Sequence, residues 1–203
     1  GFSNGLYREI DDLIDLNGAG WKDLRPVLDL YMYNGKHYLP TPVATDGGVL
    51  IYNKDTIKKY NLEDPRQLYR DGKWTWDKML EMMVAFTDPN DTQGGQFGRY
   101  GIDGWSCGYN LHLTCGVPFV SLSSDGKLVS NLEDPAVERA MNFVSEMSKA
   151  GVRFPREENG YNIDLGRVAT GMLLFADTGL WDYPTYVYRS YQMGENASYV
   201  PWP

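Results

Sequence analysis

The chain has 203 residues, 42% hydrophobic and 23% charged, which is ordinary for a globular protein and allows one large domain or two small ones. Its formal net charge of −8 and pI of about 4.7 exclude the overall basic surface that a nucleic-acid binder needs to displace counterions, and they disfavour an anionic membrane surface. No apolar run approaches the roughly 18 residues that span a bilayer.

The first part of the chain offers few regular elements. Gly1–Gly5 carries no signal peptide or lipid-attachment motif, so we expect the sequence to begin inside a longer protein. Residues 6–33 carry mixed helical patterns. Asn-Gly within Tyr33–Lys36 predicts a turn, and His37–Leu39 then predicts a short extended run.

A connector and a buried strand follow. Pro40 and Pro42 disfavour helix and predict a stiff extended segment. Val49–Tyr52 is a continuous apolar run rich in strand formers, which predicts a buried strand. Asn53–Asp55 then predicts the cap of a short helix that runs through Tyr60.

Two longer helices carry clear start signals. Thr75 can cap the first, with the carboxylate of Asp77 at the positive end of the helix dipole. Asp134 caps the second, Pro135 is its first residue and Gly151 stops it. Helical spacing predicts two buried faces. They comprise Trp76, Met79, Leu80, Met83 and Thr87 in the first helix, and Val137, Ala140, Met141, Val144 and Ser148 in the second.

The last third continues the same alternation. A third helix is predicted from Asp164 to near Gly171, and Met172–Phe175 predicts another buried strand. A helix or turn is expected near Gly179–Trp181. Short apolar runs alternating with helical patterns and loops indicate an α/β fold.

The sequence offers little for catalysis or metal binding. Cys107 and Cys115 lack a CxxC spacing, and the only histidines are His37 and His112, which we interpret as structural. The two cysteines are compatible with a disulfide or with two buried free thiols. No nucleophile elbow, P-loop or dinucleotide fingerprint is present. Asp88–Gly94 lacks the third oxygen and the closing Glu of a calcium loop, so we expect a solvated loop and no cofactor.

Large aromatic side chains in loops remain as candidates for binding. Trp105 follows Asp-Gly, Tyr109 follows Cys-Gly, Trp181 follows a predicted strand, and Trp202 lies between two prolines. Such rings either stack on a flat apolar ligand face or fill the core. Sugars present such faces with an edge of hydroxyls, which carboxylates and amides can bind.

Several segments, in order over most of the chain, resemble the second lobe of family 1 extracellular solute-binding proteins, a family that includes the maltose-binding protein. The first are Gly35–Pro40 and Leu50–Asp55, which are similar to the hinge and the first strand of that lobe. The later ones are Thr75-Trp76-Asp77, Tyr100-Gly101-Ile102, Asp125-Gly126-Lys127, Asp134–Val137, Gly166–Ala169 with Met172, Trp181, and Tyr199–Pro203.

The resemblance implies a periplasmic-binding-protein-like (type II) α/β lobe with a mixed sheet flanked by helices. Residues 1–40 would be a remnant of the first lobe plus a hinge strand, and residues 41–203 the second lobe. A sugar or oligosaccharide would bind between two lobes, and the loaded protein would meet an ABC permease. It would act outside the cell, on its surface or in the periplasm, and contact the membrane only through an anchor outside these residues. Apolar surface left on residues 1–40 makes a homodimer a hypothesis.

The resemblance also indicates ligand-binding residues. Trp181 matches a loop tryptophan and would stack on a sugar. Asp46 would supply a carboxylate to ligand hydroxyls. Tyr109 and Trp105 lie in a loop without a firm match, and Trp202 would line the cleft near the hinge. The chain departs from the family pattern at Gly47-Gly48 and at Tyr38–Pro40, which leaves the ligand open.

Other functions stay open at this stage. The same fold could bind a peptide, a polyamine or a metal chelate, and the charge of −8 would suit a cationic ligand. A carbohydrate-active enzyme would need two carboxylates facing each other in a cleft. A structural or adhesion domain would hold Trp181 and Trp105 in its core.

Overall fold

The computed structural model describes residues 5–29, 32–38, 48–104, 107–157 and 164–203. The chain forms two compact units, Gly1–Asp46 and Gly47–Pro203, which are described separately. The domain boundary predicted between residues 40 and 41 lies outside the described residues and stays a prediction.

The first unit contains short elements. A 3-10 turn, η2 (Lys22–Leu24), leads into α1 (Arg25–Asp29), and β1 (Met32–Tyr33) pairs antiparallel with β2 (Lys36–His37). The predicted Asn-Gly turn is confirmed, because Asn34 and Gly35 have φ values of 49° and 72°. Positive φ at both central residues gives the turn a twist that matches the hairpin strands.

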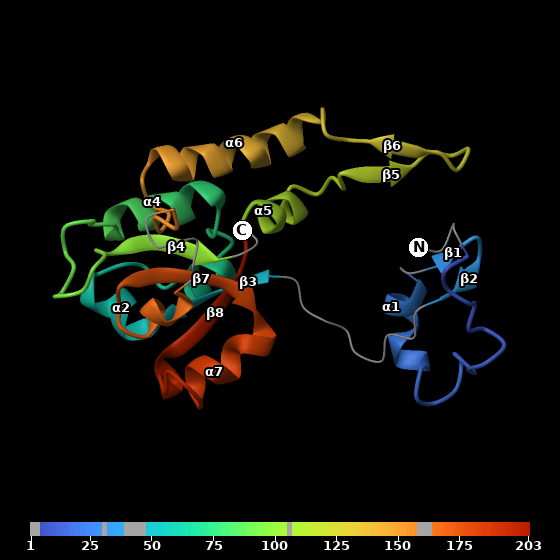
Figure 1. The fold of residues 1–203 in the computed structure, drawn as a ribbon, viewed down its shortest axis with the longest axis horizontal. Coiled ribbons are helices and arrows are strands. Elements are labelled where there is room, and N and C mark those ends of the chain that lie inside the picture. Colours follow the sequence, from blue (N-terminus) through green and yellow to red (C-terminus); the bar gives the residue numbers. More distant parts are fainter. Residues whose placement is uncertain (1–4, 30–31, 39–47, 105–106, 158–163) are drawn as a thin grey trace. The chain divides into compact units, whose positions relative to one another are not determined.

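The second unit is built on a four-stranded mixed sheet in the order β4-β7-β3-β8 (Figure 1). The strands are β3 (Gly48–Asn53), β4 (Tyr100–Gly104), β7 (Leu173–Gly179) and β8 (Ala197–Pro201). β4 runs parallel to β7, whereas β3 runs antiparallel to both of its neighbours. Consequently β4, β7 and β8 end where β3 begins.

Helices cover both faces of this sheet, so the predicted α/β fold with a mixed sheet is confirmed. They are α2 (Lys54–Lys59), α3 (Pro65–Arg70), α4 (Trp76–Phe86), α5 (Cys107–Thr114), α6 (Pro135–Lys149) and α7 (Tyr183–Val187). Short 3-10 turns are η3 (Leu165–Val168), η4 (Leu180–Asp182) and η5 (Gly194–Asn196). A hairpin of β5 (Val120–Leu122) and β6 (Leu128–Ser130) extends beyond α5 and α6 (Figure 1).

The strand predicted at Val49–Tyr52 is confirmed as the buried centre of the sheet. Leu50 and Tyr52 belong to the core cluster that includes α4 and α6, whereas Val49 and Ile51 belong to the cluster that includes η3 and α7. Alternate side chains of a strand point to opposite faces. The run is apolar throughout because both faces are covered.

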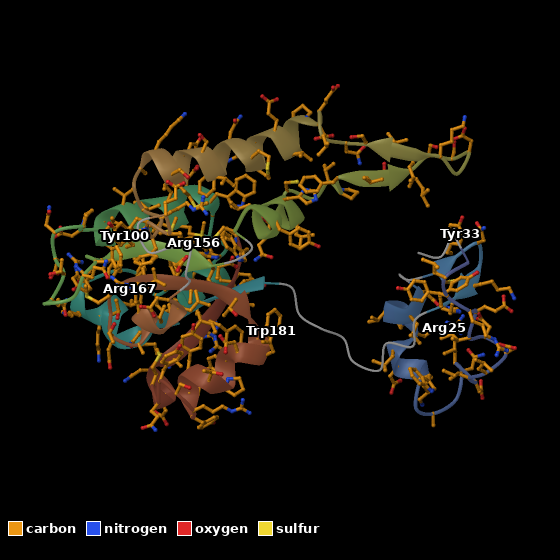
Figure 2. The ribbon with its side chains drawn as sticks, in the orientation of Figure 1. Arg25, Tyr33, Tyr100, Arg156, Arg167 and Trp181 are labelled. Carbon is orange, nitrogen blue, oxygen red and sulfur yellow. The ribbon has the colours of Figure 1, made fainter. Side chains whose placement is uncertain are left out.

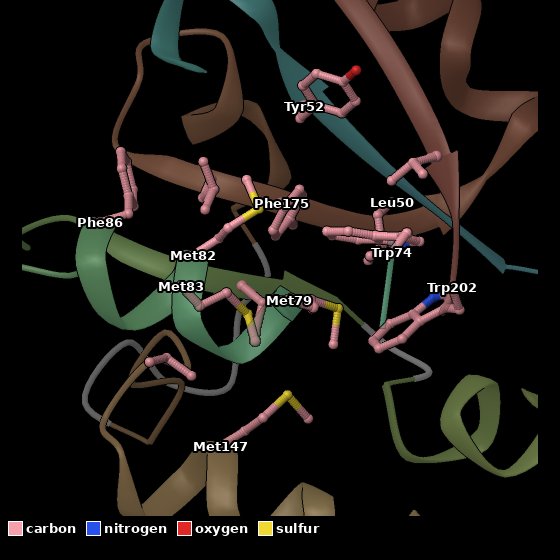
Figure 3. Packing of buried hydrophobic residues seen from close by; sticks show 14 of the residues in the cluster. Leu50, Tyr52, Trp74, Met79, Met82, Met83, Phe86, Met147, Phe175 and Trp202 are labelled. Atoms are coloured by element: carbon pink, nitrogen blue, oxygen red, sulfur yellow. The ribbon is translucent and has the colours of Figure 1, made fainter. Parts of the chain in front are cut away.

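The larger core cluster is rich in methionine and aromatic side chains (Figure 3). Phe175 of β7 makes edge contacts with Trp74 and Tyr52, at centroid distances of 5.8 and 6.3 Å. Unbranched methionines fill irregular space between such rings. They come from α4 and α6, as Met79, Met82, Met83 and Met147.

The predicted helix starts are confirmed. The side chains of Asn53, Thr75 and Asp134 accept hydrogen bonds from backbone N–H groups in the first turns of α2, α4 and α6. The buried faces differ from the prediction by a small rotation. Met82 and Phe86 are buried in α4, and in α6 Phe143 and Met147 are buried, whereas Met141 is 39% exposed. Sequence spacing is compatible with more than one buried face on each helix, and the elements that pack against the helix decide which face is buried.

Two predicted loop and helix regions also differ. The helix predicted from Asp164 to Gly171 is only the single turn η3, whose side-chain cap is absent among the described contacts. Conversely, α5 forms where we expected a loop. It has no clear apolar stripe, since Asn110 and His112 are buried beside Cys107 and Leu111. A pattern-based prediction therefore has no signal for it.

In the described part of the chain, every helix is too short or too polar to cross a membrane.

Candidate functional site

The most distinctive surface of the second unit is the sheet edge where β3 begins and β4 and β7 end. We call it the glycine edge, because Gly48, Gly104 and Gly179 occupy these three strand ends. A β-carbon on each would lie within 2.2 Å of a neighbouring side chain, at Asn110, Asp177 and Trp181 respectively. Side chains from other segments therefore pack directly onto the strand backbone.

Trp181 covers the end of β7. Its side chain comes from η4 and is 69% exposed, so one part of the ring lies against Gly179 and the rest faces solvent (Figure 2). An exposed indole fixed against backbone is a suitable platform for an apolar ligand face.

Asp177 joins three segments beneath this surface. Its carboxylate is 1% exposed, and Oδ1 accepts hydrogen bonds from Asn110 Nδ2 at 2.7 Å and from Trp202 Nε1 at 3.1 Å. Asn110 belongs to α5, Asp177 to β7, and Trp202 follows β8. The Cys107 thiol has a raised pKa, chiefly because it is buried and secondarily because it lies near the negative charge of Asp177.

A buried ion pair closes the β4 end of the glycine edge. Asp103 is 3% exposed, and its Oδ1 accepts from Arg156 Nε at 2.6 Å and from the Gly104 N–H at 2.8 Å. The Asp164 N–H donates to the other oxygen at 3.3 Å. These bonds tie the segments at residues 156 and 164 to β4.

The structure places two of the five predicted ligand-binding residues in exposed positions. Trp181 is 69% exposed and Tyr109 is 59% exposed. Tyr109 precedes Asn110, which packs on Gly48, and Gly48 pairs with Gly179 beside Trp181. The Trp181 ring therefore belongs to the glycine edge, and Tyr109 follows it only as the sequence neighbour of a residue that packs there.

Of the other three predicted residues, the structure describes only Trp202. Trp202 is 6% exposed and packs in the core, so its ring fills space between β8 and the helices. Its indole N–H is bonded to Asp177. Asp46 and Trp105 lie outside the described residues. The ligand-binding role of all five residues stays a prediction.

Sequence reasoning missed the structural role of Asp177 and the packing role of the strand-end glycines. The available signal was an acidic residue near the end of two buried strands, in Asp103-Gly104 and in Asp177-Thr178-Gly179. A carboxylate at the end of an apolar run needs hydrogen-bond partners once the strand is buried.

His112 packs beside Cys115, whereas Cys107 belongs to the larger core cluster. Both cysteines are free, with Cys107 buried and Cys115 half-buried. His112 is 4% exposed and stacks on Phe119, with ring centroids 3.2 Å apart. Its Nδ1 lies 3.9 Å from Cys115 Sγ. Of the two predicted alternatives, the structure has free thiols rather than a disulfide, and only Cys107 is fully buried.

The loop at Asp88–Gly94, which lacks part of the ligand set of a calcium loop, is held by the guanidinium group of Arg99. Arg99 contacts Asp91 at 2.7 Å and Asp88 at 3.5 Å. Among the described residues, no cluster of three or more His, Cys, Asp or Glu side chains could hold a metal ion.

Comparison with known proteins agrees with this architecture. A family model described as bacterial extracellular solute-binding protein matches residues 1–203. No curated protein matches the chain.

Solved structures of solute-binding proteins share the fold. An ABC substrate-binding protein from Listeria monocytogenes in complex with cycloalternan is 17% identical, with a TM-score of 0.69, over 93% of this chain and 46% of that one. The sugar-binding protein MalE from Xanthomonas citri is 17% identical, with a TM-score of 0.71, and the match covers 100% of this chain and 49% of that one. A solute-binding protein from Agrobacterium radiobacter in complex with ribitol is 19% identical, with a TM-score of 0.66, and the match covers 99% of this chain and 49% of that one.

The chain thus spans about half the length of these proteins. The shared fold is the type II periplasmic-binding-protein fold, as the sequence resemblance implied. With a family model matching its whole length, the chain belongs to the bacterial extracellular solute-binding proteins.

Proposed function

We propose that this chain supplies the sugar-facing surface of one lobe in the solute-binding component of an ABC importer, and that it binds its ligand without chemical change. The ligand is a sugar, an oligosaccharide or a polyol. The observation that carries the proposal is the indole of Trp181, which is 69% exposed on the glycine edge in a member of this family.

The chemistry of the edge suits a neutral hydroxylated ligand. The Trp181 ring offers a flat apolar face, and α5, whose Asn110 packs on Gly48, also carries the exposed ring of Tyr109. A sugar ring presents C–H groups to such a face, while its hydroxyls take hydrogen bonds from neighbouring groups. Similar folds in complex with cycloalternan and with ribitol support this ligand class.

Two buried carboxylates favour binding over glycoside hydrolysis. Asp103 is bonded to Arg156, and Asp177 to Asn110 and Trp202. A glycosidase needs two carboxyl groups that reach the scissile bond from opposite sides. Asp103 and Asp177 are 3% and 1% exposed, so neither carboxylate is presented to a ligand at the surface.

The proposed location and partner follow from the family. Bacterial extracellular solute-binding proteins work outside the cytoplasm, and we extend to this chain delivery of its ligand to an ABC permease. Because the chain spans about half the length of the similar structures, it supplies only part of a cleft. Its own affinity is therefore expected to be weaker than micromolar.

Titration of the ¹⁵N-labelled chain tests the proposal. Maltotriose, ribitol, mannitol and the cation spermidine are added separately, and the tryptophan indole N–H signals are followed by NMR. The indole signal of Trp181 is assigned as the one that disappears in the variant Trp181→Phe. We expect a sugar or polyol to shift this signal, and we expect Trp181→Ala to abolish binding. Tyr188→Ala is the matched control, because Tyr188 is another exposed aromatic residue, 79% exposed, on a different part of the second unit.

Other outcomes would separate the alternatives. A response to spermidine alone would favour the cationic-ligand hypothesis. New sugar products after incubation would identify an enzyme. Shifts confined to residues far from Trp181 would refute the glycine edge as the ligand surface.

A further inference from the structure

The first unit contains a histidine held between two carboxylates. His37, at the end of β2, is 2% exposed. Its Nδ1 lies 2.7 Å from Asp11 Oδ1, and its Nε2 lies 2.9 Å from Asp29 Oδ1. The backbone N–H of His37 also donates to Asp11 Oδ2 at 2.8 Å. Both ring nitrogens are therefore engaged by acceptors.

This geometry selects one protonation state. A neutral imidazole has one N–H donor and one lone pair, whereas an ionised carboxylate only accepts. With a neutral ring, one of the two short contacts would bring a nitrogen lone pair against a carboxylate oxygen. Only the imidazolium donates to Asp11 and Asp29 at once, so the arrangement requires a doubly protonated His37.

Other charged groups face the same cluster. Arg25 of α1 donates from Nε to the same oxygen of Asp29 at 2.7 Å. Lys36, next to His37 in β2, lies 3.6 Å from Glu9. Arg25 opposes a positive charge on His37, and the two carboxylates favour it.

The balance of these contacts favours the charged ring. The pKa of His37 is raised above 6.5, first by the hydrogen bond with Asp11 and then by that with Asp29, against the opposing effect of burial. The pKa values of Asp11 and Asp29 are lowered below 3.8, chiefly by their hydrogen bonds with His37.

The cluster matters because the first unit has a small core. Its buried apolar side chains, among the described residues, are Ile10, Leu16 and Leu28. Small units bury too little apolar surface to be stable without additional cross-links. His37 links the segment at Asp11, the end of α1 at Asp29, and β2. The Ile10 N–H also donates to the His37 carbonyl at 2.9 Å.

We propose that His37, clamped between Asp11 and Asp29, is a pH-sensitive switch that keeps the unit Gly1–Asp46 folded while the ring carries two protons and loosens the unit when one proton leaves. The second unit, with its own extensive core, does not depend on this clamp.

The direction of the pH dependence follows from linkage. A histidine whose pKa is raised in the folded state contributes its full stabilisation below pH 6.5, its pKa in the unfolded chain. This stabilisation is lost as the pH rises through the pKa of the folded state. Carboxylates with lowered pKa values stabilise above 3.8, and theirs is lost as the pH falls. The first unit is therefore most stable between these limits.

Two measurements on the 203-residue chain test the switch. NMR titration of the imidazole ¹⁵N signals follows His37, which is distinguished from His112 with the variant His112→Gln. Amide hydrogen exchange follows the Ile10 and His37 N–H groups from pH 5 to 9, normalised to amides of β3. We expect His37 to titrate above 6.5, and the two amides to lose protection as it deprotonates while β3 stays protected.

Matched variants identify the clamp as the cause. Asp11→Asn and Asp29→Asn should each lower the His37 pKa by about one unit, a tenfold change in its proton affinity. Asp12→Asn is the control, because Asp12 is exposed, is adjacent to Asp11 and pairs with Arg8 at 2.7 Å. It should leave the His37 titration unchanged.

The wild-type titration keeps the test decisive even if a variant unfolds the first unit. A His37 pKa at or below 6.5 in the intact chain would overturn the proposal. So would exchange protection in the first unit that stays constant while His37 loses its proton.

Discussion

The indole of Trp181 occupies the space that a β-carbon on Gly179 would need. Its Cζ3 atom would lie 1.8 Å from that carbon, and Cε3 would lie 2.1 Å from it. Gly179 has a φ of −103°, which any residue adopts, so glycine is required here for space and not for backbone conformation. The ring and the end of β7 therefore fix each other's positions.

Gly179→Ala should displace the Trp181 ring. Because the ring is 69% exposed, it can move into solvent, and the unfolding free energy should fall by about 1 kcal/mol or less. Affinity for the sugar that binds the wild-type chain should fall about tenfold, as a loss of one aromatic stacking contact. NMR titration measures both ring position and affinity. Gly20→Ala is the control, since nothing lies within 4 Å of its β-carbon position. Unchanged Trp181 signals in Gly179→Ala would contradict the packing described.

Asp177→Ala should destabilise the second unit by about 3 kcal/mol. The substitution leaves the Asn110 amide and the Trp202 indole N–H buried without this acceptor, and each unsatisfied donor costs about 1–3 kcal/mol. Urea unfolding followed by circular dichroism measures the loss. Asp125→Ala, in the exposed hairpin, should change stability by less than about 0.5 kcal/mol. A loss below about 1 kcal/mol for Asp177→Ala would show that these hydrogen bonds are not structural.

Asp134→Ala should cost about 1 kcal/mol through loss of a helix cap. The Asp134 carboxylate accepts from the Ala136 N–H at 2.8 Å, at the start of α6. Glu133→Ala is the matched control, because it removes the adjacent exposed carboxylate and no capping bond. Thermal unfolding of both variants compares the two effects, and equal midpoints would rule out the cap as a stabilising contact.

The two thiols should differ in reactivity in the folded chain. Cys107 is buried, and burial raises its pKa, so its side chain stays in the protonated form, which is a poor nucleophile. Cys115 is half-buried and is therefore more accessible to a reagent. Treatment with dithionitrobenzoate, followed by mass spectrometry, should label Cys115 alone until denaturant is added. Cys107→Ser should leave the native labelling unchanged. Rapid labelling of Cys107, or loss of both thiols to a disulfide, would contradict the structure.

Local chemistry explains what could be predicted from the sequence. Asn53, Thr75 and Asp134 cap helices by bonding N–H groups two or three residues away, and Asn34-Gly35 forms its turn within four residues. The apolar run at β3 is central because its composition permits burial on both faces. These local signals, in their order along the chain, also carried the resemblance to the solute-binding family.

Contacts between distant segments decided the rest. Trp181 and Trp202 are both loop tryptophans in sequence, yet one is 69% exposed and the other 6%. Trp202 is buried because β8 brings it to Asp177, a residue 25 positions earlier. Packing against neighbouring elements also explains why α6 buries Phe143 and exposes Met141, which was predicted to be buried. It likewise explains how α5 forms without an apolar stripe. By itself, the sequence determined the capped helices, the Asn-Gly turn and the buried strands and, through their order, the family, because caps, turns and strand runs are short-range. Only the tertiary structure decided which aromatic rings face solvent, because burial depends on segments that are remote along the chain.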